Sequence, residues 1–135
     1  MFNFIRYLNN GLSLSSLGSF IFFLVGEWNY LLMVLVALVA VDYVTGTVAA
    51  FIDKSLSSKV GFRGIAKKVF IFALVMMANF MDQVFWPDNH FIRDITILFY
   101  ILNEMISITE NAGRVGLPVP AVIKQAIEKL KNQIK

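Results

Sequence analysis

The longest apolar stretch of the chain, from Trp28 to Ile52, most constrains how it can fold. Asp42 and two threonines are its main interruptions. A helix that spans a bilayer needs about 20 predominantly apolar residues. Further apolar stretches occupy about 12–25, 69–86 and 91–109, and the first is short unless its helix starts near Ile5. The chain is therefore expected to be an all-α polytopic membrane protein with three or four transmembrane helices.

The composition supports a bilayer as the solvent of this chain. Of its 135 residues, 58% are hydrophobic and only 16% are charged. Soluble domains have roughly 45–50% apolar and about 25% charged residues. A water-soluble fold of this sequence would have too few polar side chains to cover its apolar surface.

The positive charges indicate which connections face the cytoplasm. Lysine and arginine gather in the loop 53–68 and in the tail 111–135, whereas the turns 26–29 and 87–90 contain neither. By the positive-inside rule, the loop and the C-terminus are cytoplasmic and both turns are outside. The residues expected to fix topology and to meet lipid headgroups are Lys54, Lys59, Arg63, Lys67, Lys68, Lys124, Lys129 and Lys131.

The two ends of the chain flank a membrane domain at 28–110, whose helices are expected at about 28–52, 69–86 and 91–109. Residues 1–27 form a helix that either inserts or lies on the membrane, since polar residues from Asn3 to Ser16 fall on one helical face. The cytoplasmic tail 111–135 includes a basic amphipathic helix over 119–135, which rests on the inner leaflet or packs against a partner.

Asp42 is the most informative polar residue, because a charge in hydrocarbon costs about 2.5–3.5 kcal/mol. Thr45 and Ala49 share its helical face, and Gly46 and Ala50 make a small-xxx-small pair beside them. One interpretation is that this face joins helices into an oligomer or lines a water path. The other is that Asp42 pairs internally with a lysine or arginine, or is protonated in a packed bundle.

A second polar stripe follows the stretch 91–109. It consists of residues three or four apart, with Glu104 beside them, and must face protein or water. Together the helix-packing or pore-lining candidates are Asp42, Thr45, Gly46, Ala49, Ala50, Tyr100, Asn103, Glu104, Ser107 and Glu110, and Thr96 begins the stripe. Asp82 and Arg93 flank the turn 87–90 and are expected to pair across it as a structural contact.

No catalytic constellation is present in the sequence. The single histidine, His90, falls in a turn, and the chain has no cysteine. We therefore expect no enzymatic activity, no metal site and no cofactor. The basic blocks adjoin apolar runs, so lipid headgroups explain them better than a nucleic acid does.

Three segments resemble the phage holin family that includes the clostridial toxin-secretion holins: DYVTGTVAA at 42–50, LSSKVGFRGIAKK at 56–68 and NEMISITENAGRVGLPVP at 103–120. The resemblance implies a protein that homo-oligomerises in the bacterial cytoplasmic membrane and opens lesions. An endolysin, or a large toxin, then escapes without necessary direct contact, and the cell lyses. The family residues that carry over are Asp42, Gly46, Lys59, Gly61, Gly64, Lys67, Lys68, Asn103, Glu104, Glu110, Asn111, Gly113, Gly116, Pro118 and Pro120.

Two other functions remain compatible with the sequence. One is a small helical ion channel or transporter subunit with a path through Asp42 and Glu104. The other is a membrane scaffold that recruits a soluble partner through its basic tail, in which case deletion of 119–135 abolishes function and leaves membranes intact.

Overall fold

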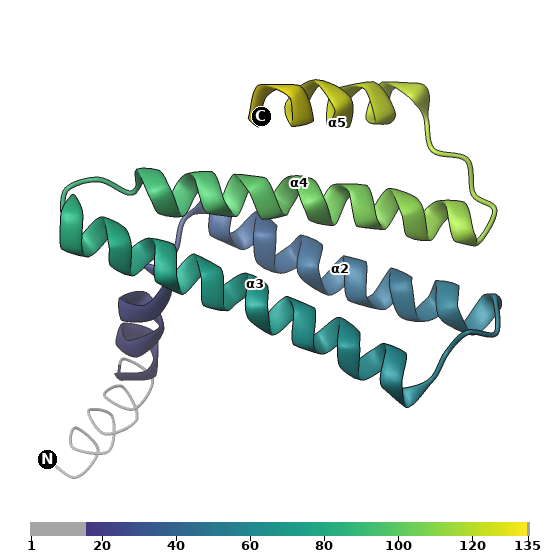
Figure 1. Ribbon diagram of the computed structural model, residues 1–135, viewed down its shortest axis with the longest axis horizontal. Helices are drawn as coiled ribbons and strands as arrows, with labels where there is room; N and C mark the ends of the chain where they lie inside the picture. Colours follow the sequence, from purple (N-terminus) through teal and green to yellow (C-terminus); the bar gives the residue numbers. More distant parts are fainter. Residues whose placement is uncertain (1–15, 135) are drawn as a thin grey trace, which may run out of the picture.

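The structure, a computed structural model, describes residues 16–134, in which helices are joined by short turns and loops and no strand occurs. The apolar helix Ser16–Val25 precedes α2 (Tyr30–Ile52), α3 (Ser58–Phe85), α4 (Phe91–Arg114) and α5 (Ala121–Ile134) (Figure 1). The expected helical class is thus confirmed. Most of the polar face expected near the N-terminus, from Asn3 to Ser13, lies outside the described residues.

Local capping sets where two of the long helices begin. The Asn29 side chain accepts a hydrogen bond from the backbone N–H of Leu32 at 3.1 Å, and the Ser57 hydroxyl accepts one from Val60 at 3.1 Å. Such side-chain oxygens satisfy N–H groups that the first helical turn leaves unpaired.

The Ser57 cap corrects the expected loop 53–68. Because α3 begins at Ser58 rather than at 69, only residues 53–57 connect it to α2, and the basic segment is mostly helical. The lysines and arginine in this segment are good helix formers, so a cap is enough to start the helix early. The helix expected over 91–109 likewise continues to Arg114.

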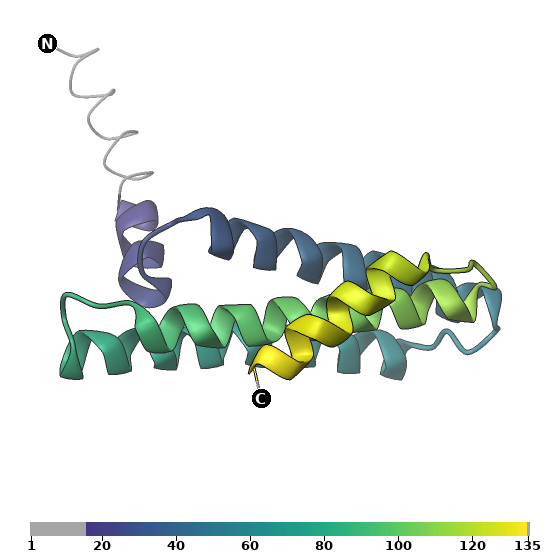
Figure 2. The same ribbon diagram turned by 90° about the horizontal axis from the view of Figure 1, so that it is seen from above.

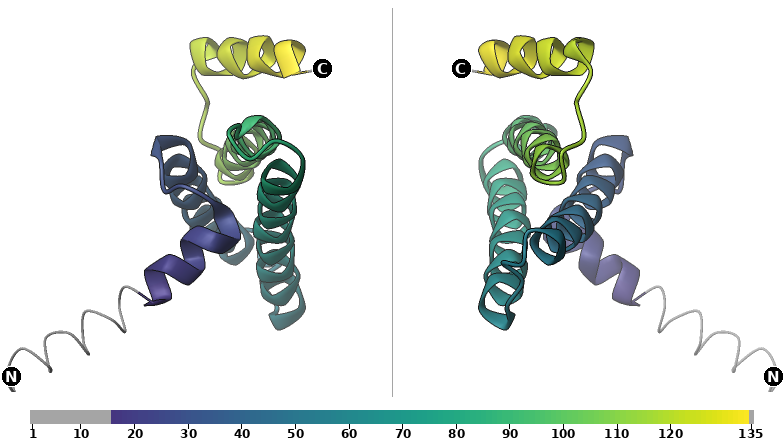
Figure 3. Two further views of the ribbon diagram at one scale, coloured as in Figure 1. Left: turned by 90° about the vertical axis from the view of Figure 1, so that its left-hand side faces the viewer. Right: turned by 90° about the vertical axis from the view of Figure 1, so that its right-hand side faces the viewer.

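The helices α2, α3 and α4 pack with α4 as the common partner. α4 contacts both α2 and α3 extensively, whereas α2 and α3 contact each other little. Viewed end-on, α2 and α3 diverge on one side of α4 (Figure 3). The core contains Leu32 and Leu35 of α2, Val75 of α3 and Ile97 of α4, all almost fully buried.

Within residues 16–134, two helices, α2 and α3, are long and apolar enough to cross a membrane. Their outer surfaces are apolar, and Val44, Phe70 and Val84 each expose more than half of their area. α4 carries several charged residues and does not meet the same criterion. Length and composition therefore support two spans, and a third or fourth span stays a prediction.

The tail forms the predicted amphipathic helix, α5, which begins directly after Pro120. Gly116 has a φ of +81°, a conformation that glycine adopts without strain, and it lies in the turn that follows α4. From there the chain reverses, so that α5 crosses over α4 (Figures 1 and 2). Its apolar residues Val122, Ile123 and Leu130 are exposed.

Candidate functional site

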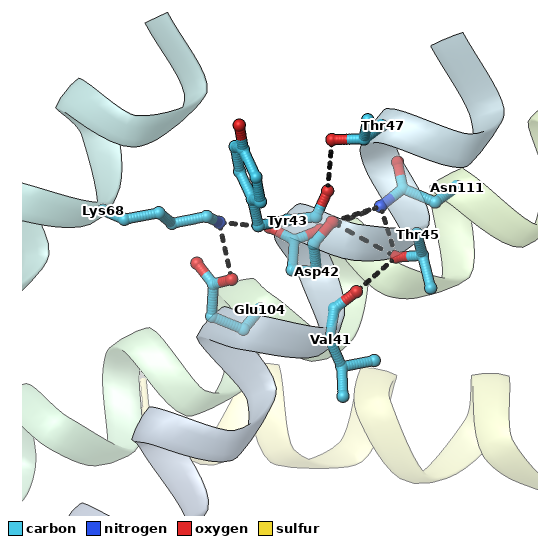
Figure 4. A network of polar contacts seen from close by, with 8 residues as sticks. All are labelled: Val41, Asp42, Tyr43, Thr45, Thr47, Lys68, Glu104 and Asn111. Carbon is cyan, nitrogen blue, oxygen red and sulfur yellow. Dashed lines mark hydrogen bonds and ion pairs between the residues drawn. The ribbon is translucent and has the colours of Figure 1, made fainter. Parts of the chain in front are cut away.

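The centre of the candidate site is an ammonium group held between two carboxylates. Lys68 of α3 forms ion pairs with Asp42 of α2 and with Glu104 of α4, the latter at 2.7 Å (Figure 4). Asp42 and Glu104 are buried, with 6% and 3% of their surface exposed. One side chain therefore connects three helices, two of which contact each other little.

Asn111 completes the network on the other side of Asp42. Its amide nitrogen donates to the Asp42 carboxylate and to the Thr45 hydroxyl, both at 2.9 Å, and lies 3.2 Å from the Asp42 carbonyl. The Thr45 hydroxyl in turn donates to the Val41 carbonyl at 2.8 Å. The buried Asp42 carboxylate thus has hydrogen-bond partners from both α3 and α4, as a charge removed from water requires.

Small residues on α2 let α4 approach this network. A Cβ added to Gly46 would lie 3.4 Å from the Asn111 amide nitrogen, a tight contact. Ala49 and Ala50 are almost fully buried. We call Asp42, Thr45, Lys68, Glu104 and Asn111 the polar network.

Of the two interpretations of Asp42, the structure shows the internal pairing, and it identifies the partner as Lys68. This differs from the role expected for Lys68 at the lipid headgroups, because only 17% of its side chain is exposed. The neighbouring Lys67 is exposed, and its contact with lipid headgroups stays a prediction.

The polar stripe of α4 does not face a single surface. Glu104 is buried in the network, Tyr100 and Ser107 are half-buried, and Asn103 and Glu110 are exposed. The Thr96 hydroxyl donates to the Ile92 carbonyl at 2.7 Å, within the helix. A pore-lining role for any of these residues stays a prediction.

The expected pairing of Asp82 with Arg93 is corrected at the opposite end of the bundle. The Asp82 carboxylate accepts hydrogen bonds from the backbone N–H groups of Ile92 at 3.1 Å and Arg93 at 2.8 Å, and so caps α4. The Arg93 guanidinium instead donates to the carbonyls of Val25 at 3.2 Å and Glu27 at 2.7 Å. A helix start has more N–H groups than acceptors, which explains why the carboxylate binds the backbone.

The helix Ser16–Val25 is held by two side chains that lie far from it in the sequence, and no sequence pattern predicts these contacts. Asn79 donates to the carbonyls of Phe23 and Leu24, both at 3.1 Å, beside the Arg93 bond to Val25. Gly26 follows with a φ of +85°, and a Cβ there would lie 2.6 Å from Arg93 Nη1. A glycine directly after an apolar helix is a common C-terminal signal, which could have predicted this turn.

At the Asp42 end of the bundle, Arg114 ties α4 to the connection after α2. Its guanidinium donates to the Asp53 carboxylate at 3.1 and 2.8 Å. A hydrogen bond from Ser55 and then the Arg114 contact hold the pKa of Asp53 below its usual value.

Comparison with known proteins identifies the chain's relatives. The model of the bacteriophage holin family matches residues 19–132. This protein belongs to the bacteriophage holin family. A protein of Bacillus phage phi105 named "Probable holin" is 36% identical over 110 residues, which cover 82% of this chain and 80% of that protein.

Two bacterial relatives are similar over most of their length. An uncharacterized protein of Halalkalibacterium halodurans is 47% identical over 89% of this chain and 92% of its own. An uncharacterized 14.9 kDa protein of Clostridium perfringens is 35% identical over 98% and 99%, respectively. No solved structure matches the chain significantly. Family and apolar helices together make this a membrane protein.

The three segments that resemble holins meet at the polar network of this holin-family chain. The first supplies Asp42 and Thr45, the second supplies Lys68, and the third supplies Glu104 and Asn111. Segments far apart in the sequence thus converge on one contact between helices.

Proposed function

We propose that this protein is a holin that oligomerises in the bacterial cytoplasmic membrane and forms lesions through which an endolysin reaches the cell wall. The observation that carries this proposal is the family match over residues 19–132. The relative named "Probable holin" supports it. The same lesions would pass a large secreted toxin, and no catalytic step by this chain is required.

The proposed topology has α2, α3 and α4 crossing the bilayer, with the residues 53–57 and α5 in the cytoplasm. The distribution of lysine and arginine supports this orientation. α4 can enter the membrane despite its buried charges because Lys68 neutralises Glu104, and because the fully buried Arg93 pairs with Asp94 at 3.1 Å and binds backbone carbonyls. Such pairing is how charged groups are tolerated at membrane depth.

Oligomerisation is proposed to use the polar residues that the single chain leaves exposed. Asn103 and Glu110 of α4 are exposed, and neither forms a side-chain hydrogen bond with the described residues. In hydrocarbon these groups gain by pairing with another copy or by facing water. Association in the plane of the membrane depends on concentration, which supplies a threshold for lesion formation.

A lysis experiment tests the proposal directly. The chain is induced in a bacterium together with a cytosolic wall-degrading enzyme that lacks a signal sequence, and culture turbidity is followed. We expect abrupt lysis with the active enzyme, and cell death without rapid lysis with a catalytically inactive enzyme as the matched control.

The other outcomes identify the alternatives. Depolarisation without enzyme escape would overturn the holin proposal in favour of a narrow channel through Asp42 and Glu104. A chain lacking 119–135 should still kill with shifted timing. Intact membranes at full expression, together with loss of function on tail deletion, would favour a scaffold.

A further inference from the structure

A cavity beside the polar network carries an inference beyond lysis. It has a volume of about 320 Å³ and lies between α2, the first half of α3 and the end of α4. Two glycines of α3 form part of its wall, where Cβ atoms would lie 3.8 Å from the Tyr43 hydroxyl at Gly61 and 3.6 Å from the Tyr43 ring at Gly64. The side chain of Tyr43 thus occupies the space beside these glycines.

The charges that line this cavity leave a positive surplus. Of its four basic residues, Lys68 is held by two carboxylates and Arg114 is held by Asp53. The other two, Arg63 and Lys67, are exposed and form no ion pair with any residue in the range 16–134. They are four positions apart on α3 and so lie on one helical face.

A second cavity continues the first along α3. Its volume is about 620 Å³, and it shares Arg63 and Lys67 with the first. On one side its lining includes the paired charges of the polar network, and along α3 it includes Phe70 and Leu74, which share the helical face of Lys67. Phe70 has 69% of its surface exposed. From Lys67 to Leu74 the helix rises about 10 Å. This distance matches a lipid headgroup followed by the upper part of an acyl chain, with the headgroup at Arg63 and Lys67 and the acyl chain at Phe70 and Leu74.

We propose that these joined cavities bind one anionic glycerophospholipid. Arg63 and Lys67 hold the phosphate by charge-assisted hydrogen bonds, and an acyl chain lies along Phe70 and Leu74. A basic pocket between membrane helices on the cytoplasmic side suits such a headgroup. A zwitterionic lipid would bring a further cation toward the unpaired Arg63 and Lys67, so the site selects against it. This inference rests on membrane insertion and not on lesion formation.

Native mass spectrometry of the full-length protein tests the site. The protein is released from detergent micelles that contain equal amounts of phosphatidylglycerol and phosphatidylcholine, and retained lipids are counted. We expect one retained lipid, with phosphatidylglycerol favoured about tenfold, because both lipids offer a phosphate to Arg63 and Lys67 but only phosphatidylcholine brings a quaternary ammonium cation toward them. Arg63→Gln with Lys67→Gln should reduce the ratio to near one.

The control pair is Lys129→Gln with Lys131→Gln on α5, which removes the same charge elsewhere and should leave the ratio unchanged. An equal loss in both pairs would overturn the proposal, because it would reflect overall charge alone. Circular dichroism verifies that all variants keep their helical content. Since no readout involves permeability, failure here leaves the holin proposal standing, and failure of lysis leaves this site standing.

Two further experiments distinguish a bound lipid from bound inorganic phosphate. Excess inorganic phosphate should not displace phosphatidylglycerol, because phosphate cannot use the apolar groove. Phe70→Ala should lower lipid retention in zwitterionic and anionic mixtures alike. Displacement by phosphate, or full retention in the Phe70 variant, would contradict a lipid site that extends along α3.

Discussion

Replacing Lys68 by methionine removes the one charge that connects α2, α3 and α4. The substitution keeps an unbranched side chain of similar length, so packing changes little. Asp42 and Glu104 remain buried and lose their shared cation. The variant therefore isolates the electrostatic part of the contact between the three helices.

The expected loss of stability follows from the geometry. At the 2.7 Å separation of Lys68 Nζ and Glu104 Oε2, attraction at an effective dielectric constant of about 20 is about 6 kcal/mol. Desolvation offsets most of this attraction while the pair is intact. Removing one partner leaves an uncompensated charge, which costs about 3–5 kcal/mol. We expect Lys68→Met to lower the free energy of unfolding by that amount.

Denaturation by sodium dodecyl sulfate in mixed micelles, followed by circular dichroism, measures this difference. Lys59→Met is the matched control, because Lys59 is exposed, lies on the same helix and forms no ion pair with the described residues; its effect should stay within about 0.5 kcal/mol. The triple variant Asp42→Asn, Lys68→Met, Glu104→Gln should recover much of the loss, since no unpaired charge remains.

Two results would refute this reasoning. If Lys68→Met unfolds like the Lys59→Met control, the polar network does not hold the three helices together. If the neutral triple variant is as unstable as the single one, the loss comes from packing or hydrogen-bond geometry and not from the stranded carboxylates.

Three other regions give independent predictions. Gly26→Ala should lower the melting temperature, because its φ is +85° and a Cβ would lie 2.6 Å from Arg93; Gly18→Ala, which has open space around it, should not. Asp82→Ala should cost about 1–3 kcal/mol in the same denaturation assay, since two N–H groups of α4 lose their acceptor; an unchanged midpoint would contradict the capping role. The lowered pKa of Asp53 means that its tether contributes stability above about pH 3.9, the usual value, and loses it as pH falls through the lowered pKa. Carbon-13 NMR of the Asp53 carboxyl group should give a titration midpoint below the usual value, and Ser55→Ala should raise this midpoint. A midpoint at the usual value in the unchanged protein would contradict the contacts of Asp53 with Ser55 and Arg114.

Much of the fold was predictable because hydropathy reports membrane helices directly. The apolar stretches at 28–52 and 69–86 correspond to α2 and to most of α3. Hydropathy does not predict the start of α3, because the charged residues and glycines in 58–68 are typical of a loop. Only the Ser57 cap, and the packing of Gly61 and Gly64 against Tyr43, reveal that the helix begins there.

The sequence predicts the two carboxylates of the candidate site but not the lysine between them. Asp42 and Glu104 were found because carboxylates in apolar stretches are costly, but their partner depends on how the helices pack. The helical period does not single out this partner, because Lys67 and Lys68 precede the buried Ile71 by four and three positions, and both spacings fall on one helical face. Only the packing of α3 against α2 and α4 identifies Lys68 as the lysine that points inward.

Arg93 shows the same limitation of sequence reasoning. It precedes the buried Ile97 by four positions, so the helical period places it on the core face of α4. Its partners are the adjacent Asp94 and the backbone carbonyls of Val25 and Glu27, and these two carbonyls lie far away in the sequence. Carbonyl groups carry no residue-type signal, so no pattern could have identified them.

The most direct measurement of the central claim uses purified protein and vesicles of bacterial lipid. The vesicles enclose a small dye and a folded wall-degrading enzyme, and release of each is followed as the protein-to-lipid ratio increases. If the protein is a holin, dye and enzyme should escape together above a threshold ratio, because oligomers open large lesions. Release of dye alone at every ratio would contradict it and would indicate a narrow pore.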